Sequence, residues 1–283
     1  MGKSCDTVLG FFLAHRSSLI AHRFCLRRVS VLAYHQVHPG FELGVNSISP
    51  RVFDRQMRFL VRQGYTSITP EALIKSLSND RPDVLPRRPI LLTFDDGYES
   101  FYTFVYPILK KYGLTATVFI PAGYIGQPNH WDVKLRLKRP RHLTHTQIQT
   151  LAQNGIDFGS HGMFHRFLTH CDRKEAEEEL VVSKRILENI LQRSVHSYAY
   201  PYGSTNAETE ALVESAGYRI AFGLDPQHET TPYRFPRMAI YRCDTAKSFH
   251  AKLGLLGQRR FWLACAQNRF INAFAYLNLL RRR

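Results

Sequence analysis

The chain has 283 residues, enough for one large α/β domain or two small ones. Hydrophobic residues make up 44% of it and charged residues 22%, and it has no internal repeat or low-complexity tract, so disordered and repeat architectures are excluded. The formal net charge is +15, from 38 basic and 23 acidic residues. We expect one main domain with short terminal appendages.

The positive charge is concentrated at the two ends of the chain. Residues 1–30 carry five basic and one acidic side chain (+4), residues 242–283 carry nine and one (+8), and the remaining +3 lies between them. Basic terminal segments indicate an anionic partner such as membrane lipid, or simply serve solubility. Nucleic acid is not expected as a partner, because no recognised motif is present and the charge does not follow a groove.

The cysteines and the N-terminus bear on the compartment. Five cysteines without a C-x-x-C pair argue against a disulfide framework and against a thiolate zinc site, and favour a reducing compartment. Residues 7–14 form a short apolar run, but Asp6 and the pair at 15–16 interrupt a signal-peptide pattern. The sequence predicts a cytoplasmic protein or one at the cytoplasmic face of a membrane. A short surface helix through residue 28 and an export signal both remain open.

The remaining chain alternates between β and α patterns. In chain order we expect a strand at 29–34, a helix at 49–64, a strand at 65–69, a helix at 70–77, a strand at 89–94, a helix at 98–112, a strand at 115–120, a helix at 144–154, a strand at 156–160, a helix at 173–192, a strand at 197–200, a helix at 206–216, and strands at 219–222 and 238–241. Repeated β-α units predict a parallel sheet, and about eight strands favour a barrel. In such barrels the functional groups lie at the carboxyl ends of the strands.

Two adjacent carboxylates, Asp95 and Asp96, follow the apolar strand at 89–94. At a strand's carboxyl end they would face a solvent-accessible mouth rather than the core. Since neighbouring strand residues point to opposite sides, the two carboxylates need not do the same job.

Three other strand ends carry groups of interest. His161 and His165 are four residues apart on one turn, and one carboxylate with two imidazoles is a common ligand set for a divalent metal. The turn at 200–203 can fix the Tyr202 N–H toward a reacting oxygen, and His35 ends the first strand. Each feature alone is common in structural roles, but their joint appearance at strand ends, in this order, is much more specific.

These motifs resemble those of a known family. Residues 93–97 (TFDDG), 161–165 (HGMFH) and 201–203 (PYG) are similar to successive motifs of the polysaccharide deacetylases, the NodB-homology or family 4 carbohydrate esterases. The resemblance covers residues 29–241. Residues 31–37 (VLAYHQV) resemble the start of the subgroup that includes poly-N-acetylglucosamine deacetylases, in which the motif order is permuted. The resemblance implies an α/β fold, a distorted (β/α)7 barrel.

The resemblance also implies residue roles. Asp96, His161 and His165 would bind a divalent metal, with Zn²⁺ expected first and Co²⁺ or Ni²⁺ also suitable. Asp95 would act as general base, the Tyr202 backbone N–H would hold the oxyanion, and His35 would be the general acid, with His250 and His228 as fallbacks. For the substrate, we expect contacts from Pro201, Tyr202 and the loop residue Trp131, which could instead be packed inside.

Two positions depart from the family pattern. The residue after the first motif histidine is usually Ser or Thr in the family, but here it is Gly162. The third motif usually begins with an arginine that orients the base, and Ala199 occupies that place. Arg237 resembles an arginine of the subgroup and is our candidate to replace it.

The expected function is a metal-dependent deacetylase that hydrolyses N-acetyl groups on a sugar of a polysaccharide or lipid-linked glycan. The alternatives are an O-acetyl carbohydrate esterase on the same scaffold and an inactive carbohydrate-binding homologue. We divide the chain into a basic N-terminal segment (1–28), a catalytic domain (29–245) and a basic C-terminal helix (246–283).

The C-terminal segment 261–280 has an amphipathic pattern. On a helix, one side would carry Trp262, Leu263 and Phe270, and the other side amides and Arg269. Such a helix could lie at an anionic membrane surface, flanked by arginines, or could pack its apolar side on the barrel. Both alternatives stay open.

Overall fold

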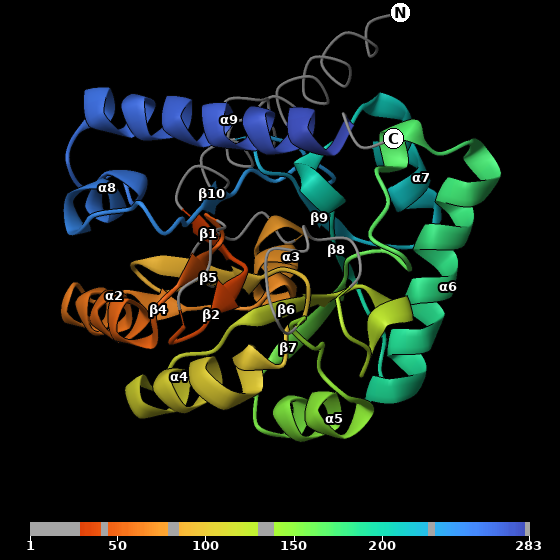
Figure 1. Ribbon diagram of the computed structural model, residues 1–283, viewed down its shortest axis with the longest axis horizontal. Helices are drawn as coiled ribbons and strands as arrows, with labels where there is room; N and C mark the ends of the chain where they lie inside the picture. The colour runs from red at the N-terminus through yellow and green to blue at the C-terminus, as the bar shows by residue number, and fades with distance from the viewer. Residues whose placement is uncertain (1–28, 41–44, 79–84, 130–138, 226–229, 281–283) are drawn as a thin grey trace, which may run out of the picture.

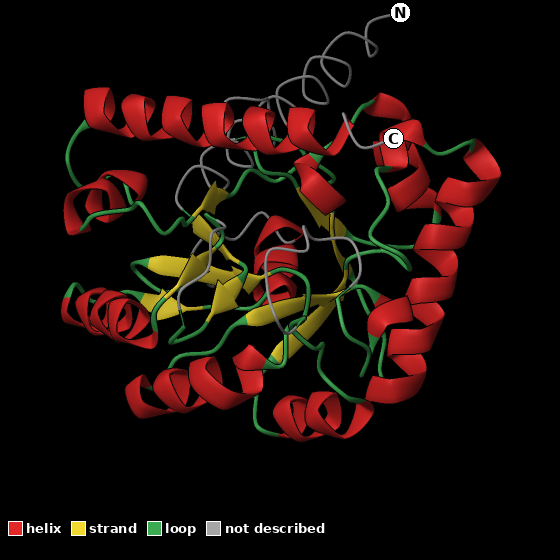
Figure 2. Ribbon diagram, in the orientation of Figure 1, coloured by secondary structure: helices red, strands yellow, loops and turns green. Residues whose placement is uncertain are grey.

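The computed structural model describes residues 29–40, 45–78, 85–129, 139–225 and 230–280, with side chains through residue 272. Parallel strands lie at the centre of the molecule and helices surround them (Figures 1 and 2). The strands of the main sheet in these ranges are β1 (Ser30–Tyr34), β4 (Thr66–Ser67), β5 (Pro89–Phe94), β6 (Thr117–Ile120), β7 (Asp157–Ser160), β8 (Ser197–Ala199), β9 (Ile220–Phe222) and β10 (Met238–Ala239).

The sheet has the order β10-β1-β5-β6-β7-β8-β9. Its first and last strands approach each other, because Phe235, just before β10, forms a parallel bridge with Phe222 of β9. The barrel is distorted at β5, whose first residues pair with β4 and whose last residues pair with β6. The prediction of a distorted (β/α) barrel is confirmed.

The helices follow the predicted order closely. They are α2 (Pro50–Arg62), α3 (Pro70–Ser78), α4 (Tyr106–Tyr112), α5 (His145–Gln153), α6 (Arg173–Leu191), α7 (Ala207–Ser215), α8 (Ala246–Lys252) and α9 (Gln258–Leu280). A π-helical turn at Phe101–Val105 leads into α4. Within the span of the predicted C-terminal helix the structure has two helices, α8 and α9. The sequence did not predict the small pair of β2 (Gln36–Val37) with β3 (Ser47–Ile48).

Polar caps explain where several helices begin. The Ser49, Thr144, Asp172 and Asn206 side chains each accept a backbone N–H from the first turn of α2, α5, α6 and α7. A cap of this kind stabilises a helix by about 1 kcal/mol, since it satisfies a donor that the helix leaves open.

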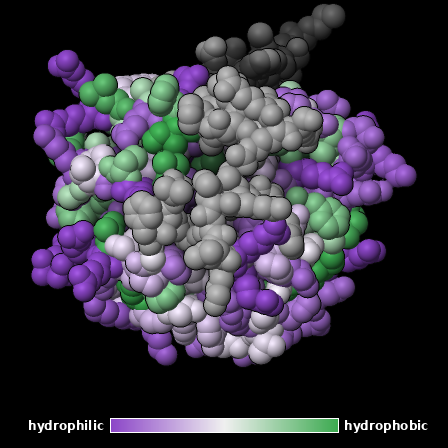
Figure 3. Space-filling view, viewed as in Figure 1, coloured by the Kyte–Doolittle hydropathy of each residue, from purple (hydrophilic) through white to green (hydrophobic). Residues whose placement is uncertain are grey.

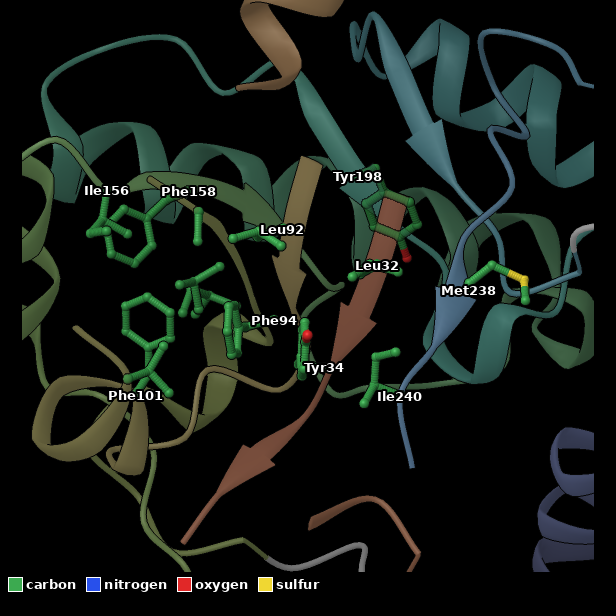
Figure 4. Close-up of a cluster of buried hydrophobic side chains, with 14 of the residues drawn as sticks. Leu32, Tyr34, Leu92, Phe94, Phe101, Ile156, Phe158, Tyr198, Met238 and Ile240 are labelled. Atoms are coloured by element: carbon green, nitrogen blue, oxygen red, sulfur yellow. The ribbon is translucent and has the colours of Figure 1, made fainter. Parts of the chain in front are cut away.

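All six residues of β5 are buried, which accounts for its continuous apolar run. Leu92 and Phe94 face the helix layer and pack with Leu32 and Tyr34 of β1 (Figure 4). Leu91 belongs to a second cluster with Phe119 and Phe222. Because strand residues alternate, Thr93 and Asp95 continue the side of Leu91, so Asp95 extends the barrel interior toward its mouth.

Helices α8 and α9 pack against β10. Phe249 of α8 and Cys265 of α9 are buried in the same core as the barrel strands. The buried Lys252 donates to the Ala239 carbonyl at 2.7 Å and pairs with Asp244, which is also buried. The C-terminal helices therefore share the core of the barrel, and the division of the chain at residue 245 stays a prediction.

The part of α9 with described side chains turns Ala264, Cys265 and Asn268 inward. Asn268 is fully buried and donates to the Ala239 carbonyl at 3.2 Å, whereas Leu263 is 64% exposed and Phe270 74% exposed. Hydrophobic surface is visible along the edge of the molecule where α9 runs (Figure 3). The alternative in which Trp262, Leu263 and Phe270 pack on the barrel is wrong, because the asparagines find backbone and side-chain partners there. Among the described residues, no helix is long and apolar enough to cross a membrane.

Candidate metal centre and active site

Asp96, His161 and His165 meet at the mouth of the barrel. Asp96 follows β5, and the two histidines follow β7. All three side chains are buried, and their potential ligand atoms lie within 4.8 Å of one another. Asp96 Oδ1 is 3.2 Å from His165 Nε2 and 3.6 Å from His161 Nε2. The sequence-predicted ligand set is therefore brought together by the fold.

The protonation of these groups suits a cation. His161 Nδ1 donates to the Ala199 carbonyl at 2.7 Å, which leaves Nε2 to face Asp96. Burial lowers the pKa of His161 to about 4, so the imidazole is neutral near pH 7 and Nε2 has a free lone pair. Burial disfavours charge on Asp96, but the contact with His165 and the nearby imidazoles outweigh it and hold the pKa of Asp96 well below its usual range. Two imidazoles and an ionised carboxylate are the donors that a divalent metal takes in proteins.

A further observation fits a bound cation at this place. Asp96 Oδ1 is buried yet accepts no well-aligned hydrogen bond from the described residues. A buried carboxylate oxygen in that state costs free energy, unless a cation completes its surroundings.

The Asp96 backbone adopts a left-handed conformation, with φ of 68°. This conformation is uncommon for a residue with a side chain and has to be held by its neighbours. His142 provides one such contact, because its Nδ1 donates to the Asp96 carbonyl at 2.6 Å while its ring stacks on Tyr98. Gly97 follows with φ of 58°, and a Cβ there would lie 2.4 Å from Ile120 Cδ1.

Asp95 is held by Arg237. The guanidinium makes two parallel bonds to the carboxylate, at 2.7 Å to Oδ1 and 2.9 Å to Oδ2. It also donates to Thr93 Oγ1 at 3.1 Å and to the Gly223 carbonyl at 3.2 Å, and it is fully buried. Burial disfavours the charge on Asp95, but the arginine, together with His161 and His35, outweighs this effect and lowers the pKa of Asp95.

The Pro201–Gly203 turn lies beside the histidines. Tyr202 has φ of 59°, and its ring stacks on Phe167 with centroids 3.8 Å apart. The same ring contacts His165 edge to face at 4.5 Å. Three of the four non-glycine residues with positive φ in the described chain are thus Asp96, His165 and Tyr202, at the candidate site. Such conformations collect at functional sites.

His35 lies beside the two carboxylates. The preceding residue, Tyr34, accepts the Asp95 N–H at 2.9 Å, and the charge of His35 contributes to the lowered pKa values of both Asp95 and Asp96. Its Nδ1 is buried and has no hydrogen-bond partner among the described residues. The fallback His250 instead stacks on Phe59 of α2. The other fallback, His228, and Trp131 lie outside the described residues.

The sequence reasoning missed two residues at this site. His142 supports Asp96 from 46 positions away, and no local pattern marks it. Phe164 lies between the two motif histidines and is 47% exposed, with Tyr124 edge to face at 6.4 Å. An exposed aromatic within the second motif was the available signal for Phe164.

The fold and the site together define a class of protein: a NodB-type barrel with a candidate metal centre of one carboxylate and two imidazoles at its strand ends. The family model for polysaccharide deacetylase matches residues 83–221. Over these residues the chain is similar to this family.

Relatives and solved structures agree with this family. The Bacillus subtilis protein YxkH, whose name describes it as a polysaccharide deacetylase, is 31% identical to this chain over 199 residues. The match covers 70% of this chain but only 65% of YxkH. The poly-beta-1,6-N-acetyl-D-glucosamine N-deacetylase of Staphylococcus aureus is 26% identical, with 69% of this chain and 68% of that protein covered. The Streptococcus pyogenes deacetylase PplD, solved with acetate, superposes with a TM-score of 0.66 at 25% identity, covering 76% of this chain and 93% of that chain.

Proposed function

We propose that this protein is a metal-dependent carbohydrate N-deacetylase, a hydrolase that cleaves N-acetyl groups from a sugar of a polysaccharide or lipid-linked glycan. The observation that carries the proposal is the convergence of the Asp96, His161 and His165 ligand atoms next to the Asp95–Arg237 pair. The staphylococcal relative, named for deacetylation of a poly-N-acetylglucosamine, supports an N-acetylated sugar as the substrate class.

A divalent ion bound by the three ligands would polarise the acetyl carbonyl and lower the pKa of a water molecule from ~15.7 toward ~7. Zn²⁺ suits the Asp-His-His set best, and Co²⁺ and Ni²⁺ also suit it. Asp95 accepts a proton from the attacking water, while Arg237 keeps its carboxylate ionised and oriented.

The remaining roles follow from position. The Tyr202 backbone N–H donates to the acetyl oxygen as it becomes negative, and such a donor typically contributes ~2.7–4 kcal/mol to catalysis. His35 gives a proton to the sugar nitrogen as the C–N bond breaks, so that acetate and a free amine are released. Pro201 and Tyr202 border the substrate, and Trp131 remains a proposed sugar contact.

Acetate release from acetylated glycans tests this function. The purified protein is given N-acetylated glucosamine oligomers and O-acetylated sugars, before and after chelator treatment and again after Zn²⁺ addition. We expect acetate from the N-acetylated set, lost with the chelator and restored by the ion. Release only from O-acetyl esters would support the esterase alternative, and no release from any substrate would support the inactive homologue.

We further propose a peripheral location at the cytoplasmic face of an anionic membrane. The support is the outward side of α9, which carries Trp262, Leu263 and Phe270 together with the exposed Arg259 and Arg260. Aromatic and aliphatic side chains beside arginines suit the boundary between headgroups and acyl chains.

Vesicle flotation tests this location. We expect binding to phosphatidylglycerol vesicles that weakens with salt and with Leu263→Ser, but not with Tyr102→Ser, which removes an exposed aromatic side chain elsewhere. Equal recovery with phosphatidylcholine vesicles, or none with either lipid, would contradict it.

A further inference from the structure

The turn that joins the two candidate metal ligands is short and conformationally demanding. His161 and His165 are separated by three residues, and both Gly162 and His165 have left-handed backbones, with φ of 81° and 56°. A left-handed residue with a side chain costs roughly 1–2 kcal/mol, so neighbouring groups must hold the turn in place.

Backbone contacts hold the turn on one side. The Ala122 N–H donates to the Gly162 carbonyl at 2.9 Å, and the Gly123 N–H donates to the Met163 carbonyl at 2.8 Å. Both donors belong to the short helical turn Ala122–Tyr124 that follows β6. The carbonyl groups of Gly162 and Met163 are thereby satisfied, while the N–H groups of the turn point elsewhere.

The N–H groups of Met163 and Phe164 are taken by one side chain of α6. Glu179 Oε2 accepts from Met163 at 2.7 Å and from Phe164 at 2.9 Å, and Oε1 also lies 3.1 Å from the Phe164 nitrogen. Glu179 is only 3% exposed, and Arg166 Nε is 3.7 Å from its Oε1. Hydrogen bonds from amides to a carboxylate are among the stronger ones in proteins.

Helix α6 is itself fixed to the strand that leads into the turn. Ser183 Oγ lies one turn beyond Glu179 and is 2.8 Å from Ser160 Oγ, which in turn accepts the Gly162 N–H at 3.2 Å. Helix α6 is therefore bound to this segment both before His161, at Ser160, and after it, at Met163 and Phe164.

Gly162 and Glu179 depend on each other sterically. A Cβ on Gly162 would lie 2.7 Å from Glu179 Oε2, closer than real side-chain contacts allow. The position where the family usually has a Ser or Thr hydroxyl is thus approached by a carboxylate from α6.

We propose that Glu179 is a positioning residue of the candidate metal centre: its carboxylate fixes the turn that carries His161 and His165, in the place that a side chain at position 162 would otherwise occupy. The inference rests on the proposed function, because it assumes that the two histidines bind an ion. Glu179 acts through the backbone and touches neither ion nor substrate. Residues of this kind typically change metal affinity 10- to 100-fold when they are replaced.

The test compares Glu179→Gln with Glu178→Gln, a matched change at the neighbouring exposed position of the same helix. Glutamine removes the negative charge that strengthens both N–H bonds, and its nitrogen cannot replace Oε1 as the second acceptor of the Phe164 N–H. In the apo protein, we expect faster hydrogen exchange at the Met163 and Phe164 amides in Glu179→Gln only. We also expect Zn²⁺ affinity, measured by chelator competition, to fall about 10- to 100-fold in that variant and to stay unchanged in Glu178→Gln.

Wild-type exchange rates and affinity in Glu179→Gln would overturn the inference while leaving the proposed function intact. If the wild-type protein itself bound no divalent ion, the proposed function would fail instead. Should Glu179→Gln not fold, Glu179→Asp keeps the charge and withdraws the carboxylate by one methylene, and the same two readouts apply.

A second check is Gly162→Ala, which should weaken Zn²⁺ binding more in the wild type than in Glu179→Ala, where the space is open. Equal losses in the two backgrounds would contradict the steric coupling.

Discussion

The buried pair of Asp95 and Arg237 gives the sharpest stability prediction. Replacing Arg237 with methionine keeps an apolar side chain but removes the guanidinium that lies over the Phe119 ring and makes both bonds to the Asp95 carboxylate. Arg237 is fully buried and Asp95 is 2% exposed, so water cannot replace the lost bonds. Removal of one partner of such a pair typically costs ~3–5 kcal/mol.

A double-mutant cycle separates this cost from lost packing. In metal-free protein we expect Arg237→Met to lower the free energy of unfolding by ~3–5 kcal/mol, whereas Arg237→Met with Asp95→Leu should recover most of it, because neither charge of the pair is left. Urea unfolding of the wild type, both single variants and the double variant supplies the four values. Additive losses, or a loss under ~1 kcal/mol for Arg237→Met, would refute the reasoning.

The same pair predicts a pH dependence. The pKa of Asp95 is lowered in the folded state, so its contribution to stability is present above the unfolded pKa of ~3.9 and is lost as the pH falls below it. Without Arg237, burial is no longer outweighed and the folded pKa of Asp95 rises. The stability difference between the wild type and Arg237→Met should therefore shrink toward low pH, and a difference that grows on acidification would contradict this.

Other predictions concern the catalytic and ligand residues. Asp95→Asn should keep its metal but lose about 10²–10⁴-fold in kcat, and normal turnover would remove Asp95 as the base. His161→Ala should lower the metal-to-protein ratio in elemental analysis, since a ligand is lost. His35→Ala should reduce kcat with metal content unchanged, whereas wild-type kinetics would transfer the acid role to another group. His142→Phe keeps the ring but loses the bond to Asp96, so Zn²⁺ affinity should fall about 10-fold.

Much of the barrel could be predicted from local patterns. The bounds of β5 agree with the apolar run 89–94 because a strand buried on both faces must be apolar throughout. Helix α6 begins after the Asp172 cap, and α4 ends at Gly113, which has φ of 64° and so can terminate a helix. These signals lie within a few residues of the structure that they define.

The inner arrangement of the site depends on contacts that the sequence does not encode locally. The Asp95–Arg237 bond joins residues 142 positions apart and was inferred only through the family resemblance. Glu179 lies beside the exposed Glu178, and only its helical spacing from the buried Ala176 and Ser183 distinguishes it. A run of charged residues usually indicates a solvent-exposed face of a helix. For this reason the sequence did not predict that Glu179 is buried and contacts the turn at 161–165.

The orientation of α9 shows a different limit. Periodicity separated an apolar from a polar side, but it could not determine which side docks on the barrel. The outcome depends on the Ala239 and Leu224 carbonyls, which accept the amides of Asn268 and Asn272. A hydropathy pattern describes side chains only, so it cannot predict where backbone carbonyl acceptors at strand ends will lie.

The most direct test of the central claim is the anomalous scattering of a zinc-soaked crystal. The account predicts one strong peak within ligand distance of Asp96 Oδ1, His161 Nε2 and His165 Nε2, with Asp95 still bound to Arg237 beside it. A crystal in which zinc occupies other positions fully, but which shows no peak between these three atoms, would contradict the account.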